Sequence, residues 1–292
     1  MADQPDLNGM PGVISFTKKW HSEPYEFISP TRPELSAAGK NVIVTGGGTG
    51  IGLAIARAFV KAGAASVAIV GRREDKLKSG VADISAAAAE GTRVLYETAD
   101  LSDLEQSKAA FQAIVDKVGK IDVLVSNAGR LTAPGPITDY DADTLIRGVT
   151  DALLVLFNSF QAFQPVAGPE PILLNTSSCL ANITPTPGLA GYSIAKAAAL
   201  KLANYIATEN PGVHVVNVQP SWVATEGNGY QKEATDSADL PGHFYVWLTS
   251  TEARFLKSKF VWANWDAQEL LEKAEEIKNS TLLNWVVDAT PM

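Results

Sequence analysis

Short apolar runs and amphipathic stretches alternate along most of the chain. Each run is rich in valine, isoleucine and leucine, and a stretch with apolar residues at helical spacing follows nearly every run. We expect seven strands, at residues 41–45, 66–71, 93–100, 121–129, 171–178, 213–221 and 259–264. Continuously apolar strands that alternate with helices predict an α/β fold, a doubly wound parallel sheet with helices on both faces.

Three segments depart from this alternation. Residues 1–38 contain several prolines and little periodicity, which predicts an extended N-terminal arm before a single domain at 39–292. The polar, glycine-containing stretch at about 225–245 is typical of a mobile substrate lid. The amphipathic pattern near the end predicts a C-terminal helix at about 267–286.

Composition narrows the function classes. The chain has 292 residues and a net charge of −8, which argues against a nucleic-acid partner because phosphate contacts need clustered Lys and Arg. Its one cysteine, Cys179, cannot form an intrachain disulfide, and no apolar run is long enough to span a bilayer. The start, "MADQPDLNGMPG", lacks the features of a secretory signal. We therefore expect a cytoplasmic protein, with no membrane partner.

No metal site is expected. The three histidines, His21, His214 and His243, are scattered and lack the spacing of metal ligands. Cys179 adjoins Ser178, and the simplest interpretation is a buried, inert thiol.

A glycine-rich turn, "VTGGGTGIGLAIA", follows the first strand and opens the first helix. Gly46, Gly50 and Gly52 leave room for a tight turn and for a pyrophosphate to approach backbone N–H groups at the helix N-terminus. The alternative is a glycine turn without a ligand, but the strand before and the helix after favour a dinucleotide site. We assign to cofactor binding the residues Gly46, Gly48, Thr49, Gly50, Ile51 and Gly52.

Two arginines stand where the second strand ends, in "VAIVGRREDKL". An NAD site places Asp or Glu there to bind the ribose 2′-hydroxyl, whereas the donor fork of a guanidinium matches a 2′-phosphate. Arg72 and Arg73 therefore favour NADP(H) over NAD(H). The alternative is a solvated pair at a helix start, although cations there oppose the helix dipole.

A tyrosine and a lysine lie four residues apart in "GYSIAKAAAL", a run of helix formers. At this spacing Tyr192 and Lys196 share one helix face. The pair is either a proton donor whose pKa the cation lowers or an idle surface contact.

Six motifs in order give the chain its resemblance to a known family. They are "TGGGTGIG" (45–52), "ADLSD" (99–103), "SNAG" (126–129), "TSS" (176–178), "YSIAK" (192–196) and "PSWVAT" (220–225). Over residues 40 to about 265 the chain resembles the classical short-chain dehydrogenases/reductases, which implies a Rossmann-like sheet. The related extended type would need a glycine where Thr49 stands.

The resemblance implies a catalytic set. Ser178, which lies 14 residues before Tyr192, matches the catalytic serine of the family, and Ser177 fits the register less well. In this family the tyrosine protonates the substrate carbonyl and the serine orients it. Lys196 would lower the pKa of Tyr192 from about 10 and hold the nicotinamide ribose.

The resemblance also implies further cofactor contacts. Asp100 and Leu101 would lie at the adenine, and the turn formed by Asn127, Ala128 and Gly129 would line the adenosine side. The loop after the sixth strand would hold the carboxamide. Its assigned residues are Pro220, Val223 and Thr225.

Two positions depart from the family pattern. The asparagine that the family carries on the helix after the fourth strand falls on Ala152 here, with Asp151 as a substitute if the register slips by one. The usual "PG" is replaced by Ser221 and the bulky Trp222 after Pro220. The second change lies beside the expected nicotinamide pocket, whereas the asparagine of the family helps to hold a water that relays protons to the lysine.

These features leave three functions open. The first is an NADPH-dependent reductase, or the reverse alcohol dehydrogenase, for a hydrophobic carbonyl compound. For this function, the N-terminal arm of the chain and its "FVWANWD" ending resemble fungal members of the family, which often modify secondary metabolites. The second is a non-redox rearrangement, cyclisation or dehydration with NADP(H) as a structural element, and the third is a cofactor-sensing binding protein.

The resemblance implies a homodimer or homotetramer. A group of residues either lines a hydrophobic pocket or belongs to the core or a subunit interface: Tyr230, His243, Phe244, Trp247 and Trp262.

Overall fold

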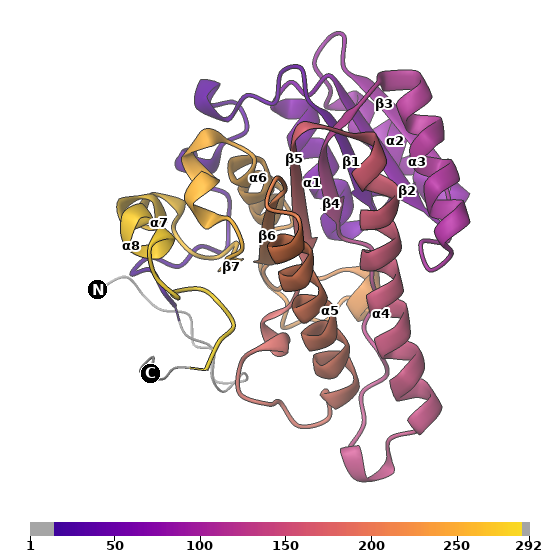
Figure 1. The fold of residues 1–292 in the computed structure, drawn as a ribbon, viewed down its shortest axis with the longest axis vertical. Coiled ribbons are helices and arrows are strands. Elements are labelled where there is room, and N and C mark those ends of the chain that lie inside the picture. The colour runs from indigo at the N-terminus through magenta and orange to yellow at the C-terminus, as the bar shows by residue number, and fades with distance from the viewer. Residues whose placement is uncertain (1–14, 288–292) are drawn as a thin grey trace.

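A parallel sheet of seven strands forms the centre of the protein, in a computed structural model that describes residues 15–287 (Figure 1). The strand order is β3-β2-β1-β4-β5-β6-β7, and every pair is parallel. The strands are β1 (Asn41–Thr45), β2 (Ser66–Gly71), β3 (Arg93–Thr98), β4 (Ile121–Ser126), β5 (Ala167–Thr176), β6 (His214–Gln219) and β7 (Phe260–Trp262). All seven predicted strands are confirmed.

The direction of winding reverses at the centre of the sheet. Strand β1 pairs with β2 on one side and with β4 on the other, as in the registers Val42↔Val67 and Val42↔Val123. The chain therefore leaves β1 in one direction and returns to its other side later. In such sheets a crevice opens beyond the carboxyl ends of the strands at the reversal, and ligands bind there.

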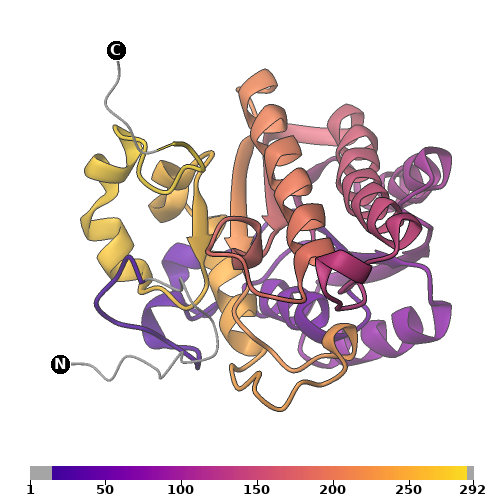
Figure 2. The same ribbon diagram turned by 90° about the horizontal axis from the view of Figure 1, so that it is seen from below.

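Helices cover both faces of the sheet, and each face has its own apolar core (Figures 1 and 2). One face carries α1 (Gly50–Lys61), α2 (Glu74–Ala86) and α6 (Asp239–Leu248). The other carries α3 (Leu104–Val118), α4 (Ala142–Phe163) and α5 (Ala190–Glu209). This arrangement confirms the predicted doubly wound fold. Between residues 15 and 287, none of the helices combines the length and apolarity needed to cross a bilayer.

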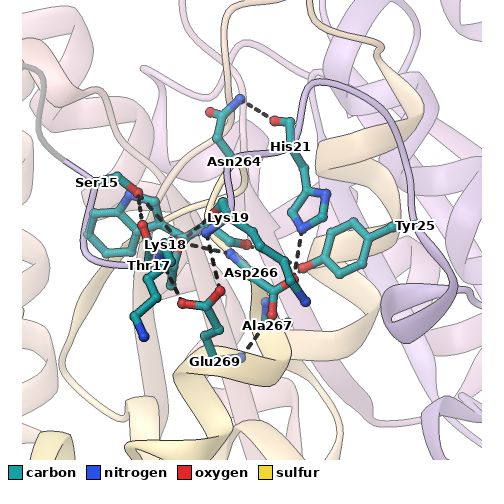
Figure 3. Close-up of polar contacts among 11 residues, drawn as sticks. Ser15, Thr17, Lys18, Lys19, His21, Tyr25, Asn264, Asp266, Ala267 and Glu269 are labelled. Atoms are coloured by element: carbon teal, nitrogen blue, oxygen red, sulfur yellow. Dashed lines mark hydrogen bonds and ion pairs between the residues drawn. The ribbon is translucent and has the colours of Figure 1, made fainter. Parts of the chain in front are cut away.

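The described part of the N-terminal arm packs against the start of α7 (Ala267–Glu272) (Figure 3). His21 Nε2 lies 2.8 Å from Asp266 Oδ2, and the Tyr25 hydroxyl accepts a hydrogen bond of 2.7 Å from Ala267 N. The backbone N–H of Lys18 donates to the Glu269 carboxylate at 2.7 Å. Segments from opposite ends of the chain thus lie side by side; residues 1–14 of the predicted arm fall outside the described residues.

The predicted C-terminal helix at 267–286 is wrong beyond its first half. Two short helices, α7 and α8 (Ala274–Lys278), replace it, and Asn279 and Ser280 then bond back to carbonyls of the last turn. The following residues pair with the edge of the sheet instead, where Phe260 N donates to Leu283 O at 2.8 Å. Leu283 therefore packs beside β7 and not on a helix face, whereas Trp285, Val286 and Val287 are exposed.

The exposed segment after β6 is shorter than the predicted lid at 225–245. It contains one 3-10 turn, η6 (Glu226–Asn228), and ends where α6 begins at Asp239. Within α6, Phe244 and Tyr245 are fully buried against α1. The last third of the predicted lid is therefore core helix.

Candidate active site

Four loops at the carboxyl ends of β1, β4, β5 and β6 carry most of the predicted site residues. These strands are neighbours in the sheet, so their loops meet at the crevice next to the reversal point.

The glycine turn after β1 is built for close backbone approach. Gly46 has a φ of +67°, which glycine adopts without steric cost. A Cβ on Gly52 would lie 2.4 Å from Gly46 O and 2.6 Å from Asn127 Nδ2, so no side chain fits at position 52. The first turn of α1 is thereby held against the glycine turn.

Thr45 connects this turn to the loop after β4. Its hydroxyl accepts hydrogen bonds from the backbone N–H groups of Asn127 (2.9 Å) and Ala128 (3.0 Å). The Asn127 side chain donates to Thr45 O at 3.1 Å. Sequence analysis missed Thr45, although its place directly before Gly46 was a signal.

The N-terminus of α1 is open to an anion. Its N-cap, Thr49, makes no side-chain capping bond, and the first turn contains no acidic residue. The unpaired N–H groups and the positive end of the helix dipole therefore point at the crevice. A pyrophosphate fits these groups.

The two predicted selectivity arginines lie at the rim of the crevice. Arg73 is the N-cap residue of α2, and its Nη1 lies 2.6 Å from Glu226 Oε1 in the loop after β6. Arg72 Nη1 lies 4.0 Å from Asp100 Oδ2. Hydrogen bonds from the hydroxyl and N–H of Ser102 lower the pKa of Asp100, so its carboxylate is charged at neutral pH. Both guanidinium groups are largely exposed.

Ser178, Tyr192 and Lys196 come together from β5 and α5. Ser178 follows β5 as the N-cap residue of a short 3-10 turn, and Tyr192 and Lys196 lie in the first two turns of α5. The Ser178 side chain lies close enough to Tyr192 to lower the pKa of the phenol. Lys196 Nζ lies 5.8 Å from the Tyr192 ring centroid and donates to Thr176 O at 3.0 Å. The spacing of these residues thus brings one phenol, one hydroxyl and one ammonium to the same place.

The ionisation of this set differs from the sequence-based expectation. Burial raises the pKa of Tyr192 to about 12, and the Ser178 side chain only partly offsets this. Burial also lowers the pKa of Lys196 to about 8. The expected lowering of the Tyr192 pKa by Lys196 is wrong for the structure, because desolvation outweighs a cation 5.8 Å from the ring.

Gln219 joins the loops after β5 and β6. Its Oε1 accepts a hydrogen bond from Cys179 N at 2.8 Å, and its Nε2 donates to Ser221 O at 3.1 Å. Sequence analysis missed this residue because its partners follow from strand pairing. Cys179 itself is buried, and burial raises the pKa of its thiol to about 11, as expected for an inert thiol.

The structure shows the surroundings of the two positions that depart from the family pattern. Ala152 is half-buried in α4, whereas Asp151 is exposed. Ser221 has a φ of +75°, in the left-handed region that favours glycine, and its buried hydroxyl has no hydrogen-bond partner among residues 15–287. Glycine, the usual residue of the family at this position, adopts this backbone conformation without strain, whereas Ser221 is strained in it.

Replacing Ser221 by glycine is expected to stabilise the protein by about 1 kcal/mol, because an L-residue in the left-handed region is strained and the buried hydroxyl is unpaired. Urea denaturation of Ser221→Gly and of the control Ser221→Ala, which keeps the strain, measures this effect. Equal unfolding free energies for the two variants would refute the role of strain.

The aromatic residues that were expected to line a hydrophobic pocket or to be buried elsewhere do not share one environment. Phe244 and Trp247 are fully buried and Trp262 is nearly so, which assigns them to the core, whereas Tyr230 is exposed. In the described part of the chain, no group of three or more His, Cys, Asp or Glu side chains is arranged to hold a metal ion.

Comparison with known proteins gives relatives of similar length. A short chain dehydrogenase/reductase of Claviceps purpurea is 32% identical over 269 residues, which is 89% of this chain and 90% of the relative. The short chain dehydrogenase citE of Monascus ruber is also 32% identical, over 90% of this chain and 93% of the relative.

Solved structures share the fold. A short chain dehydrogenase from Burkholderia cenocepacia, in complex with NADP, superposes with a TM-score of 0.71 and 26% identity over 80% of this chain and 99% of its own. An alcohol dehydrogenase from Thermococcus sibiricus, complexed with 5-hydroxy-NADP, superposes with a TM-score of 0.64 and 26% sequence identity. The match covers 72% of this chain and 89% of the alcohol dehydrogenase. A family model described as short chain dehydrogenase matches residues 40–236, the part that carries every catalytic and glycine motif above. The chain belongs to the short-chain dehydrogenase/reductase family.

Proposed function

We propose that the protein is an NADPH-dependent reductase that converts the carbonyl group of a hydrophobic compound to an alcohol. The observation that supports this most is the meeting of Ser178, Tyr192 and Lys196 beside an open helix N-terminus and a glycine turn. The relatives from Claviceps and Monascus are fungal short chain dehydrogenases, which agrees with the resemblance to fungal members from which we propose a natural-product substrate.

The residues of the crevice fit a dinucleotide. The glycine turn leaves the space that a Cβ would fill, and α1 presents unpaired N–H groups to a pyrophosphate. Arg72 and Arg73 favour a 2′-phosphate on the adenosine ribose. When bound, NADPH supplies a hydride to the carbonyl carbon.

The protein supplies the proton. Because its pKa is raised to about 12, the Tyr192 phenol keeps its proton at neutral pH and can donate it to the carbonyl oxygen. Ser178 is placed to orient the same oxygen by a hydrogen bond. Lys196 would hold the nicotinamide ribose. In the reverse reaction, oxidation of the alcohol, the phenolate would take up the proton as a base.

A non-redox reaction in the same pocket is the second candidate. Ala152 cannot make the polar contacts of the family's asparagine, and Ser221 and Trp222 alter the loop beside the expected nicotinamide. These two departures favour it, whereas the complete Ser178–Tyr192–Lys196 set favours reduction.

Deuterium transfer separates the two candidates. The purified protein is incubated with a metabolite extract from its source organism and NADPH deuterated at C4, one face at a time. We expect a product with one added deuterium from one of the two cofactors. A product formed without label from either cofactor would contradict the reductase and favour the non-redox reaction.

We also propose that the protein forms homo-oligomers through α4 and α5. Large apolar side chains of these helices are 40–63% exposed: Ile146, Phe157, Ile194 and Tyr205. A second copy that covers this surface would remove the apolar area from water.

A further inference from the structure

The loop after β6 is closed at its base and reaches α2 at its tip. At the base, Asp236 Oδ2 accepts a hydrogen bond of 2.9 Å from Trp222 N, and Asp236 N donates to Trp222 O at 3.2 Å. The tip is η6, whose first residue, Glu226, pairs with Arg73. We call residues 222–236 the base-closed loop.

The contact between this loop and the cofactor crevice has two points. The first is the ion pair of 2.6 Å between Arg73 Nη1 and Glu226 Oε1. The second is Thr225, whose Cγ2 lies 3.0 Å from the position that a Cβ on Gly50 would take. The base-closed loop therefore lies over the glycine turn and binds the residue that the sequence assigns to cofactor selection.

Glu226 faces two cations at the start of α2, Arg73 and Lys76. Its pKa is lowered by the hydrogen bond from Arg73 first, and then by the charges of Arg73 and Lys76. The charged or titratable groups that raise the pKa of Arg73 are Glu226, Asp75 and Tyr230. Glu74, in the same turn of α2, pairs instead with Lys78 at 3.0 Å. The carboxylate that holds the Arg73 guanidinium thus comes from the loop and not from α2.

We propose that Glu226 is a specificity-determining residue, which competes with the 2′-phosphate of the cofactor for Arg73. The inference rests on the proposed use of NADP(H). A carboxylate and a phosphate both match the guanidinium fork, and two anions at one fork repel each other. A nucleotide with a 2′-phosphate must therefore displace Glu226, and the tip of the base-closed loop moves with it. A nucleotide without this phosphate leaves the ion pair intact.

The competition is modest in size. Both side chains of the pair are about half exposed, and solvent screens such pairs. We expect removal of the Glu226 charge to tighten binding of a 2′-phosphorylated nucleotide by about three- to tenfold, while binding of its unphosphorylated analogue stays the same.

Titration calorimetry of the full chain tests this with two probes, adenosine 2′,5′-bisphosphate and adenosine 5′-monophosphate. Glu226→Gln removes the competing charge, and Glu233→Gln, an exposed glutamate of the same loop, is the matched control. We expect only Glu226→Gln to tighten only the bisphosphate. Hydrogen exchange of the wild-type protein is the second readout: the bisphosphate, but not the monophosphate, should speed exchange at Asn228 N and Gly229 N, which donate within η6.

Three results would overturn the inference: an unchanged or weaker affinity of Glu226→Gln for the bisphosphate, an equal gain for the monophosphate, or an equal gain in Glu233→Gln. If the wild type prefers the bisphosphate in any of these cases, the proposed cofactor stands and only the role of Glu226 fails. If the wild type binds both probes equally, the preference for NADP(H) fails as well.

Discussion

Replacing Tyr192 by phenylalanine is expected to lower kcat for carbonyl reduction by about 100- to 10,000-fold, the range that general acid catalysis contributes. The substitution removes one hydroxyl, the proposed proton donor, and keeps the aromatic ring. In the proposed site the glycine turn and the arginines bind the cofactor, so we expect the Kd for NADPH to change little. Steady-state kinetics together with fluorescence titration of NADPH measures the two effects separately.

The matched control for this variant is Tyr205→Phe. Tyr205 lies on the same helix, α5, but its side chain is exposed. Its activity should stay within about twofold of the wild type, because phenylalanine keeps the ring that belongs to the proposed oligomer surface and removes only a hydroxyl outside the catalytic set. A Tyr192→Phe enzyme with nearly full kcat would show that another group donates the proton and would remove the main support for the proposed mechanism.

The arrangement of the site was predictable because it follows from local patterns. Strands β1 and β2 begin and end at the predicted residues, 41–45 and 66–71, since glycines and polar residues bound their apolar runs. Parallel pairing then places the ends of β1, β4, β5 and β6 at one edge. The order of the motifs alone therefore predicts which side chains meet.

The ionisation of Tyr192 was not predictable from the same patterns. Helical spacing places Lys196 on the same face, but it fixes neither the distance between the two functional groups nor their desolvation. In the structure Lys196 Nζ donates a hydrogen bond to Thr176 O, on the preceding strand. Burial also removes water from the side chains of Tyr192 and Lys196. These are tertiary effects, and they reverse the expected direction of the tyrosine pKa.

Long-range contacts also explain the errors near the C-terminus. The periodicity at 267–286 is that of an amphipathic helix, yet Phe260 N and the Lys259 side chain bind the chain at Leu283, Ser280 and Asn284. These bonds pair the segment with the exposed edge of β7. A local apolar pattern cannot distinguish a helix face from a sheet edge that needs a cover.

Replacing Gly52 by alanine is expected to weaken NADPH binding by at least 100-fold. Alanine is the better helix former by about 1 kcal/mol, so helix propensity alone would predict a more stable protein. Sterics oppose this, because the new Cβ would lie 2.4 Å from Gly46 O and 2.6 Å from Asn127 Nδ2. Both neighbours belong to the turns that we propose hold the cofactor, so relieving the clash would distort the proposed phosphate site itself.

The effect of this clash on folding should be smaller than its effect on binding. Overpacking in a well-packed region costs about 1–3 kcal/mol, and the gain in helix propensity offsets part of it. Gly212→Ala is the control, because a Cβ there meets no atom within 4 Å. Fluorescence titration with NADPH and urea denaturation of both variants measure the two effects. Tight NADPH binding by Gly52→Ala would mean that the pyrophosphate does not rest on this turn, and the crevice would then lose its assignment as the dinucleotide site.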